Sequence, residues 1–473
     1  MLSVNSGHGV RTTQRMNPPI RLLSGMVVTG QPYRSPVTDP NPCEQFPGDL
    51  GTPPDLPATI PSVGATTVDA VMSGVFARLV GQQAVEAELV AAAAAARGDS
   101  THSGLTTGSM THAWLITGPP GSGRSIAAQC FAAALQCTSD GTPGCGECRA
   151  CTTTMAGTHG DVRRVVPEGL SIGVDEMRAI VQTASRRPST GRWQIVVIED
   201  ADRLTEGAAN ALLKVVEEPP ASTVFLLCAP SVDPEDVAVT LRSRCRHVAL
   251  VTPSAAAIAQ VLTDADGLDP DQAAWAASVS GGHVGRARRL ATDSDARDRR
   301  TQALGLARDA ATPSRTYAAA EELVATAEAE AKALTEGRNE AETEELRTAL
   351  GAGGTGKGTA GAMRGAAGAI KDLEKRQKSR QTRASRDALD RALIDLATHF
   401  RDALLMSSGA DQVTLNHPDM SDRAGALADH ASPERLLRCI EAVLQCREAL
   451  ATNVKPKFAV DAMVATIGRS LRD

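Results

Sequence analysis

Four cysteines follow one another in a spacing that suits a metal ion. Cys137, Cys145, Cys148 and Cys151 form the pattern C-x7-C-x2-C-x2-C, and the Gly/Pro-containing segment GTPGCGEC supplies tight turns. Each two-residue gap lets adjacent thiolates reach one ion, and four thiolates in tetrahedral geometry make a closed zinc site. No ligand position remains for water, so we expect a structural Zn²⁺ rather than a catalytic one. An iron–sulfur cluster and free thiols are the alternatives.

A glycine-rich segment, GPPGSGRS, could cradle phosphate groups. It follows the apolar run AWLIT and opens a helical pattern, which is the context that a phosphate-binding loop requires. The candidate nucleotide-binding residues are Gly118, Gly121, Gly123, Arg124 and Ser125. The segment matches GxxxxGK[ST] except that arginine replaces lysine, and a fork-shaped guanidinium is no simple substitute for a compact ammonium. ATP or ADP binding is therefore open and hydrolysis is doubtful; the alternative is a plain strand-to-helix turn.

A second apolar run, QIVVI, ends in acidic residues. In phosphate-loop ATPases a strand-end acid holds Mg²⁺ and the next one orients the attacking water. Here Glu199 precedes Asp200, the reverse of the usual Asp-Glu order. Two altered catalytic elements in one chain favour a lost hydrolytic role, and Mg²⁺ binding is correspondingly doubtful.

The segment TLRSRC contains a candidate arginine finger, Arg244. An arginine on a rigid loop can stabilise phosphoryl-transfer charge in a neighbouring subunit, an effect worth about 10³ to 10⁵ in rate. Composition alone would instead make Arg242, Arg244 and Arg246 a solvated face. A further glycine-rich segment, Gly351–Gly358, contains Lys357 but follows no apolar strand, so we interpret it as a flexible linker.

The elements around these motifs predict a doubly wound α/β domain. Continuous apolar runs are typical of parallel strands covered on both faces, and helical patterns lie between them. The expected strands are Ala113 to Thr117, Gln194 to Ile198, Val224 to Cys228 and His247 to Val251. No convincing strand follows Val251, and apolar residues then recur at helical spacing, as in Leu389, Leu393, Leu396 and Phe400.

Composition changes along the 473 residues indicate several domains. Residues 1–71 hold 11 of the 26 prolines and are expected to be disordered, with Met72 as a candidate true start. We expect a nucleotide-binding-like domain with the cysteine insert at 72–252 and a helical lid at 253–310. A charged helix with a Gly-rich and basic linker at 311–385 would precede a helical oligomerisation domain at 386–473. The basic run from Lys371 to Arg386 has seven Lys/Arg against two acids; DNA-backbone contact there is a minority hypothesis beside a solvated linker.

Charge and hydropathy exclude several classes of protein. The net charge of −6 argues against coating nucleic acid by bulk charge. No apolar stretch approaches the ~18 residues needed to cross a bilayer, and no secretory signal is evident. We therefore expect a cytoplasmic protein with no membrane partner.

The motifs in this order, HAWLITGPPGSGRS, the four-cysteine insert, AGTHGDVRRVVPEG, ANALLKVVEEPP and TLRSRC, resemble the bacterial DNA polymerase III clamp-loader subunits, and the delta-prime branch most closely. The likeness covers about residues 75 to 300 and weakens toward the C-terminus. It implies an α/β AAA+ P-loop module, a small helical lid and an all-α collar that joins subunits into a pentameric ring.

The resemblance also implies roles for individual residues. The family's zinc ligands fall on the four cysteines, and its arginine finger falls on Arg244, acting in trans on ATP held by a motor subunit. The phosphate loop falls on Gly118 to Ser125, while Ala229 and Pro230 replace the expected polar sensor. Gly285-Arg286 matches a second nucleotide sensor weakly.

The function implied is that of a delta-prime stator, a non-hydrolysing subunit of the clamp loader. Its partners would be the gamma/tau and delta subunits, with the sliding clamp reached indirectly and primed DNA through the complex. The alternative is an active gamma/tau-type ATPase motor, which would need Arg124 to replace lysine productively. A stand-alone zinc-dependent DNA-binding protein is disfavoured by the acidity and by the AAA+ context.

Overall fold

The computed structural model describes residues 74–98, 110–350, 359–410, 412–452 and 454–472. The predictions for the N-terminal extension 1–71 and for the glycine-rich segment Gly351–Gly358 lie outside the described residues.

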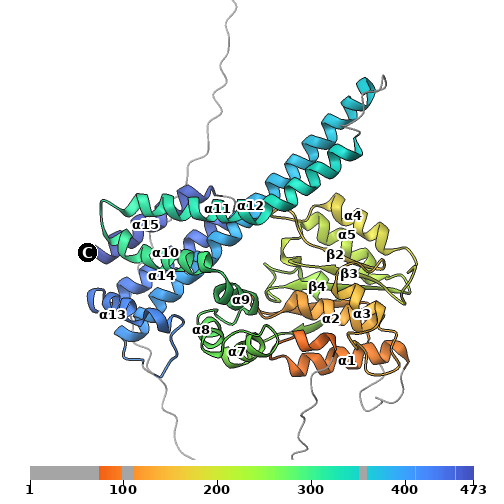
Figure 1. Ribbon diagram of the computed structural model, residues 1–473, viewed down its shortest axis with the longest axis horizontal. Helices are drawn as coiled ribbons and strands as arrows, with labels where there is room; N and C mark the ends of the chain where they lie inside the picture. The colour runs from red at the N-terminus through yellow and green to blue at the C-terminus, as the bar shows by residue number, and fades with distance from the viewer. Residues whose placement is uncertain (1–73, 99–109, 351–358, 411, 453, 473) are drawn as a thin grey trace, which may run out of the picture. The chain divides into compact units, whose positions relative to one another are not determined.

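One five-stranded parallel sheet organises the first part of the chain (Figure 1). Its order is β2-β3-β4-β1-β5, with β1 paired to both β4 and β5. The strands are β1 (Ala113–Thr117), β2 (Val162–Val165), β3 (Gln194–Ile198), β4 (Thr223–Ala229) and β5 (Arg246–Ala249). Four of the five were expected from the sequence, and the fifth, β2, was not.

Helices cover both faces of this sheet, which is why its strands consist of continuous apolar runs. One set of alternate side chains, including Trp114 and Ile116, packs with α1 (Gln83–Arg97) and α2 (Arg124–Gln136). The other set, including Leu115, packs with helices on the opposite face. Those helices are α4 (Val174–Ala184) and α5 (Glu206–Glu217), while α3 (Arg149–Met155) packs against α2. The short elements are η1 (Val75–Arg78), η3 (Ala201–Arg203) and α6 (Val239–Arg242).

Beyond the sheet the described residues are helical, as expected. The first three helices, α7 (Ala255–Asp264), α8 (Pro270–Ser278) and α9 (Val284–Thr292), share a small core of their own that includes Ile258 and Leu290. These helices occupy the region predicted as a lid. The parallel sheet with flanking helices and the helical remainder confirm the expected fold class.

A larger core joins the remaining helices. It contains Leu389, Leu393, Leu396 and Phe400, which the helical spacing predicted to share one face. The helices are α10 (Ser294–Ala311), α11 (Thr316–Ala349), α12 (Thr359–Ser407), η4 (Pro418–Met420), α13 (Ser421–His430), α14 (Pro433–Ala451) and α15 (Pro456–Arg472). Leu306 and Leu323 belong to the same core, so the bundle takes in residues well before 386.

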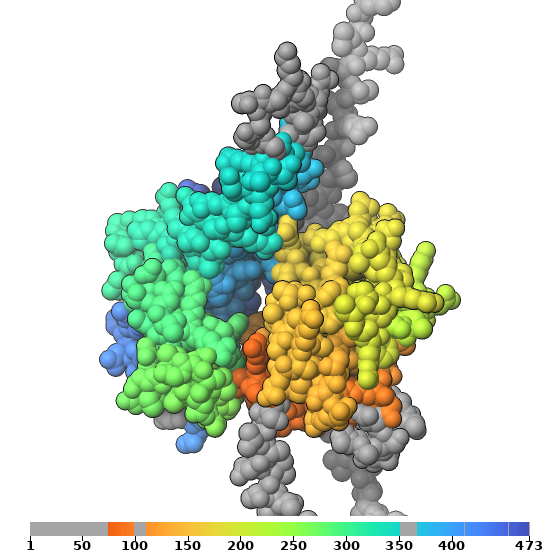
Figure 2. Space-filling view, turned by 45° about the vertical axis from the view of Figure 1, so that its right-hand side comes forward, coloured from red at the N-terminus to blue at the C-terminus, as the bar shows by residue number. Residues whose placement is uncertain are grey.

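The basic run from Lys371 to Arg386 is helical, and the expectation of a linker there is wrong. It lies within α12, side by side with α11 (Figure 1, Figure 2). Leu373 is buried, and Arg380 forms an ion pair with Glu342 of α11 at 3.0 Å. Packing against a neighbouring helix therefore fixes a segment whose charge alone suggested a solvated chain. None of the helices in the described residues has the length and apolar character of a membrane span.

Candidate functional site

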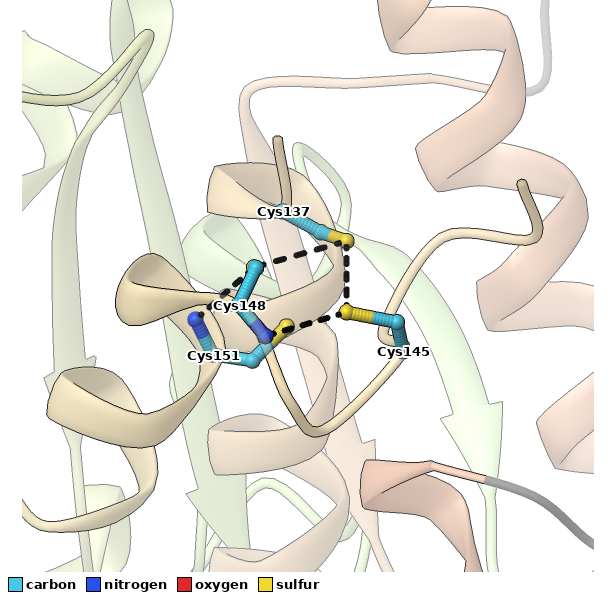
Figure 3. A group of neighbouring side chains, drawn as sticks. All are labelled: Cys137, Cys145, Cys148 and Cys151. Atoms are coloured by element: carbon cyan, nitrogen blue, oxygen red, sulfur yellow. Dashed lines mark hydrogen bonds between the residues drawn. The ribbon is translucent and has the colours of Figure 1, made fainter. Parts of the chain in front are cut away.

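The four cysteines converge at the junction between α2 and α3 (Figure 3). Cys137 caps the end of α2, Cys148 caps the start of α3, and Cys151 lies in the first turn of α3. Cys145 comes from the loop between the helices, whose turns use Gly144 and Gly146 at φ 90° and 82°. Residues that carry a side chain rarely adopt these left-handed backbone conformations, so the glycines permit the loop to fold the thiols inward.

The loop is also tied down from outside. Arg97 of α1 donates hydrogen bonds to the carbonyl oxygens of Ser139 at 2.9 Å and Cys137 at 3.1 Å. Gly74 lies against the same loop, because a Cβ there would meet the Gly144 oxygen at 2.2 Å. These contacts hold parts of the loop backbone without using the sulfurs.

The cysteine sulfurs are close enough to share an ion. All four ligand atoms lie within 4.8 Å of one another, with 3.7 Å between the sulfurs of Cys137 and Cys145 and 3.9 Å between those of Cys148 and Cys137. Burial raises the pKa of Cys148, but hydrogen bonds from Thr138 and Cys151 outweigh it and lower that pKa to about 6. A donor set of this kind can hold a metal ion.

The predicted phosphate loop has the conformation that its glycines allow. Gly121 and Gly123 adopt φ 89° and 95°, and Gly123 caps α2, so backbone N–H groups face the space before the helix. The loop is closed on one side by His283 at the start of α9. A Cβ on Gly121 would lie 2.5 Å from the Cβ of His283.

Two side-chain atoms of the loop are buried without a hydrogen-bond partner: Ser122 Oγ and Arg124 Nη1. Ser122 Oγ lies inside the loop, 2.6 Å from where a Cβ on Gly118 would sit. A buried polar group that makes no hydrogen bond is costly and calls for an explanation. An anion held by the loop would supply the missing acceptor for Arg124.

The strand-end acids are both engaged by arginines. Glu199 accepts from Arg164 of β2, with 2.6 Å from Nη2 to Oε1. Asp200 accepts from Arg383 of α12, with 2.5 Å from Nη2 to Oδ2. In this arrangement an arginine holds one oxygen of each carboxylate, which opposes the use of that carboxylate as a ligand for Mg²⁺.

Asp202 was not singled out in the sequence, although it ends the same acidic segment. One of its oxygens, Oδ1, is buried without a partner. Burial and the charge of Asp200 raise the pKa of Asp202, while the charge of Arg124 lowers it. The available signal was the acidic segment EDAD, and a buried oxygen without a partner distinguishes its last member.

The first candidate sensor position lacks a polar side chain, and the second, Arg286, is paired within the chain. Pro230 accepts a hydrogen bond from the backbone of Gly118 at 3.2 Å, so the end of β4 does lie beside the loop. Ala229 and Pro230 nevertheless offer no polar side chain there. Arg286 of α9 forms an ion pair with Asp395 of α12, and both side chains are largely buried.

The three arginines near β5 have different partners. Arg246 pairs with Glu88 at 2.7 Å and lies over the ring of Trp114, which are structural contacts. Arg242 donates to the carbonyl oxygen of Val232 at 3.2 Å. Arg244 is 38 % exposed and therefore remains accessible from outside.

The structure thus places the predicted residues in separate groups. The phosphate loop leads into the start of α2, where Arg124 is the first residue. The acidic segment after β3 lies nearby, because the charge of Arg124 acts on Asp202. The cysteines lie at the other end of α2, about 20 Å away by helix rise. A metal there has no direct access to phosphates bound at the loop.

Comparison with known proteins gives consistent matches. A family model described as "DNA polymerase III, delta subunit" matches residues 99–254, and one described as "DNA polymerase III, delta subunit, C terminal" matches residues 384–457. The chain is 39 % identical to the DNA polymerase III subunit delta' of Pseudomonas aeruginosa over 186 residues. That alignment covers 38 % of this chain and 55 % of the relative.

Two further relatives extend the comparison. The subunit delta' of Escherichia coli is 40 % identical over 145 residues, which are 30 % of this chain and 43 % of the relative. The subunit gamma/tau of Mycobacterium tuberculosis is 33 % identical over 174 residues, 36 % of this chain and 28 % of the relative. The chain thus spans about half or less of the length of the relatives it matches.

Proposed function

The chain belongs to the DNA polymerase III clamp-loader family of delta' and gamma/tau subunits, and from this premise we propose that it is a delta'-type subunit that does not itself hydrolyse ATP. In this role it helps to assemble the loader ring and supplies Arg244 in trans to the ATP site of a motor subunit. The motor subunits then load the sliding clamp on primed DNA in the cytoplasm.

The observation that carries the proposal is the pairing of both strand-end acids with arginines. A phosphate-loop ATPase needs such carboxylates for its metal ion and for the attacking water. Glu199 and Asp200 are bound by Arg164 and Arg383 instead. Arg286, the candidate second sensor, is likewise bound by Asp395. Three groups that would act on ATP, the two strand-end acids and Arg286, are thus paired within the chain.

Structural zinc at the four cysteines is part of the same proposal. A tetrahedral site with Zn–S of about 2.3 Å places neighbouring sulfurs roughly 3.8 Å apart. The two sulfur pairs at 3.7 and 3.9 Å fit that geometry. The ion would fix the turn between α2 and α3, and the residues that hold it would be Cys137, Cys145, Cys148 and Cys151.

A gamma/tau-type motor is the second candidate. The loop keeps its glycine conformations, and Arg124 Nη1 is buried without a partner, as expected of a side chain that awaits an anion. This reading needs Arg383 and Arg164 to release the two acids when nucleotide binds. Binding of ATP or ADP without turnover is compatible with the first candidate, whereas turnover requires the second.

Reconstitution with a cognate motor subunit and a delta subunit, in the presence of clamp and primed DNA, tests the proposal. We expect one assembly that contains all three kinds of subunit, and ATP turnover higher than that of the motor and delta subunits alone. Failure to co-assemble, or turnover that does not depend on this chain, would contradict it.

A further inference from the structure

The guanidinium of Arg244 is held in place by its own chain. Its Nη2 lies 2.6 Å from Oε1 of Glu217, and its Nη1 donates to the carbonyl oxygen of Thr240 at 2.7 Å. Nη1 also donates to Ser243 Oγ at 3.2 Å. A guanidinium has five N–H groups, so these contacts leave donors free for a phosphate oxygen.

The negative charge of Glu217 does not stabilise the helix that carries it. It is the last residue of α5, and a negative charge at a helix C-terminus is opposed by the helix dipole. The next residue, Glu218, is also exposed and acidic, but makes no ion pair among those of the described residues. Two neighbouring carboxylates thus share an unfavourable place, and one of them binds Arg244.

We propose that Glu217 is a positioning residue, which orients Arg244 toward the nucleotide of a neighbouring subunit. The inference rests on the proposed function, since it assigns Glu217 a part in the trans action of Arg244. Arg244 joins α6 to β5, and α6 packs against α5, so the pair links a loop to the end of a helix. Fixing a long side chain before it meets its target avoids losing rotamer freedom at that moment.

The pair is accessible from outside, as this role requires. The side chains of Arg244 and Glu217 are 38 % and 45 % exposed. A contact of this exposure is weak enough to adjust, and loss of the carboxylate leaves no buried charge behind. Removing the charge of Glu217 should therefore alter the orientation of Arg244 without unfolding α5.

The test compares Glu217→Gln with Glu218→Gln in the full loader, with the motor and delta subunits, clamp and primed DNA present. We expect E217Q to lower kcat for ATP about two- to five-fold with KM for ATP unchanged, and E218Q to match the native chain. Glu217→Asp should recover part of the loss. A lower KM for ATP in E217Q would show that Glu217 holds Arg244 back, and would overturn the positioning role.

A double variant separates this proposal from the one on which it rests. In Arg244→Ala, adding E217Q should change nothing, because the carboxylate then has no arginine to orient; a purely structural role would give a further loss. If R244A lowers turnover while E217Q equals E218Q, only the positioning role fails. If R244A itself leaves turnover unchanged, the trans role of Arg244 and the positioning role both fail.

Discussion

Arg383 of α12 binds Asp200, the second strand-end acid, with 2.5 Å between Nη2 and Oδ2. The same guanidinium also donates to the carbonyl oxygen of Pro167. Asp200 has a φ of 53°, a left-handed conformation found at no other non-glycine position in the described part of the chain. A strained residue is therefore tied to a helix that lies 183 residues further along the sequence.

Loss of this contact should destabilise the protein. Both side chains are largely covered, at 15 % and 27 % exposure, so Arg383→Ala leaves a charged acceptor poorly satisfied. We expect the free energy of unfolding to fall by about 1–3 kcal/mol in urea titrations. Lys378→Ala is the matched control, because Lys378 is exposed on the same helix, and it should change stability by less than about 0.5 kcal/mol. Equal stability of the two variants would contradict the contact.

The cysteine cluster should carry one metal ion per chain. Removing one ligand, as in Cys145→Ser, should abolish stoichiometric zinc in elemental analysis and expose residues 137–151 to protease. Cys245→Ser is the control, since Cys245 lies outside the cluster and burial raises its pKa to about 12. Metal-free chain that resists protease as well as the loaded chain would refute a structural role.

The helical bundle should lose stability as the pH falls. Burial, followed by the charge of Arg423, lowers the pKa of His399 to about 4, and burial, followed by Arg300, lowers that of His417 to about 3. Protonation is thus harder in the folded state than in the unfolded chain, where histidine has a pKa near 6.5. The contribution of the two neutral histidines to the free energy of unfolding is therefore fully present above about pH 6.5 and declines as the pH falls below it.

His399→Leu isolates the contribution of one ring. The variant should show a shallower decline of unfolding free energy between pH 7 and 5 than the native chain, whereas His430→Gln, at an exposed position, should keep the native slope. The comparison of slopes removes the effect of metal loss, which is common to all three proteins. Identical slopes for the native chain and His399→Leu would rule out this contribution.

Restoring lysine to the phosphate loop should improve binding but not turnover. Arg124→Lys gives the loop the compact ammonium of the usual motif, while Glu199 and Asp200 keep their arginine partners. We expect tighter binding of a fluorescent ATP analogue, by up to about ten-fold, or 1.4 kcal/mol. Multiple-turnover hydrolysis by this variant would show that the acids are available after all.

Local motifs made much of the site predictable. The glycines of the phosphate loop and the spacing of the cysteines act over a few residues. The structure shows positive φ at Gly121 and Gly123, and it brings the four cysteine sulfurs within 4.8 Å of one another. The strand β2 was missed because its sequence, VRRV, carries two exposed arginines and lacks a continuous apolar run. One of them, Arg164, binds Glu199, a partner that no short-range pattern can reveal.

The long-range contacts explain the remaining misses. From α12, Arg383 reaches Asp200 beside the phosphate loop and Asp395 reaches Arg286 of α9, and each partner lies more than a hundred residues away in sequence. The basic run suggested a linker because its helix depends on packing against α11. Pairing between distant charges depends on the assembled fold, so composition and periodicity alone could not predict it.

Steady-state ATP turnover by the purified chain alone, with Mg²⁺ present, shows whether this subunit hydrolyses ATP by itself. We expect no turnover above background, because Arg164 and Arg383 pair with the two acids that hydrolysis requires. Turnover that disappears in Arg124→Ala would contradict this expectation and would identify the chain as a motor subunit.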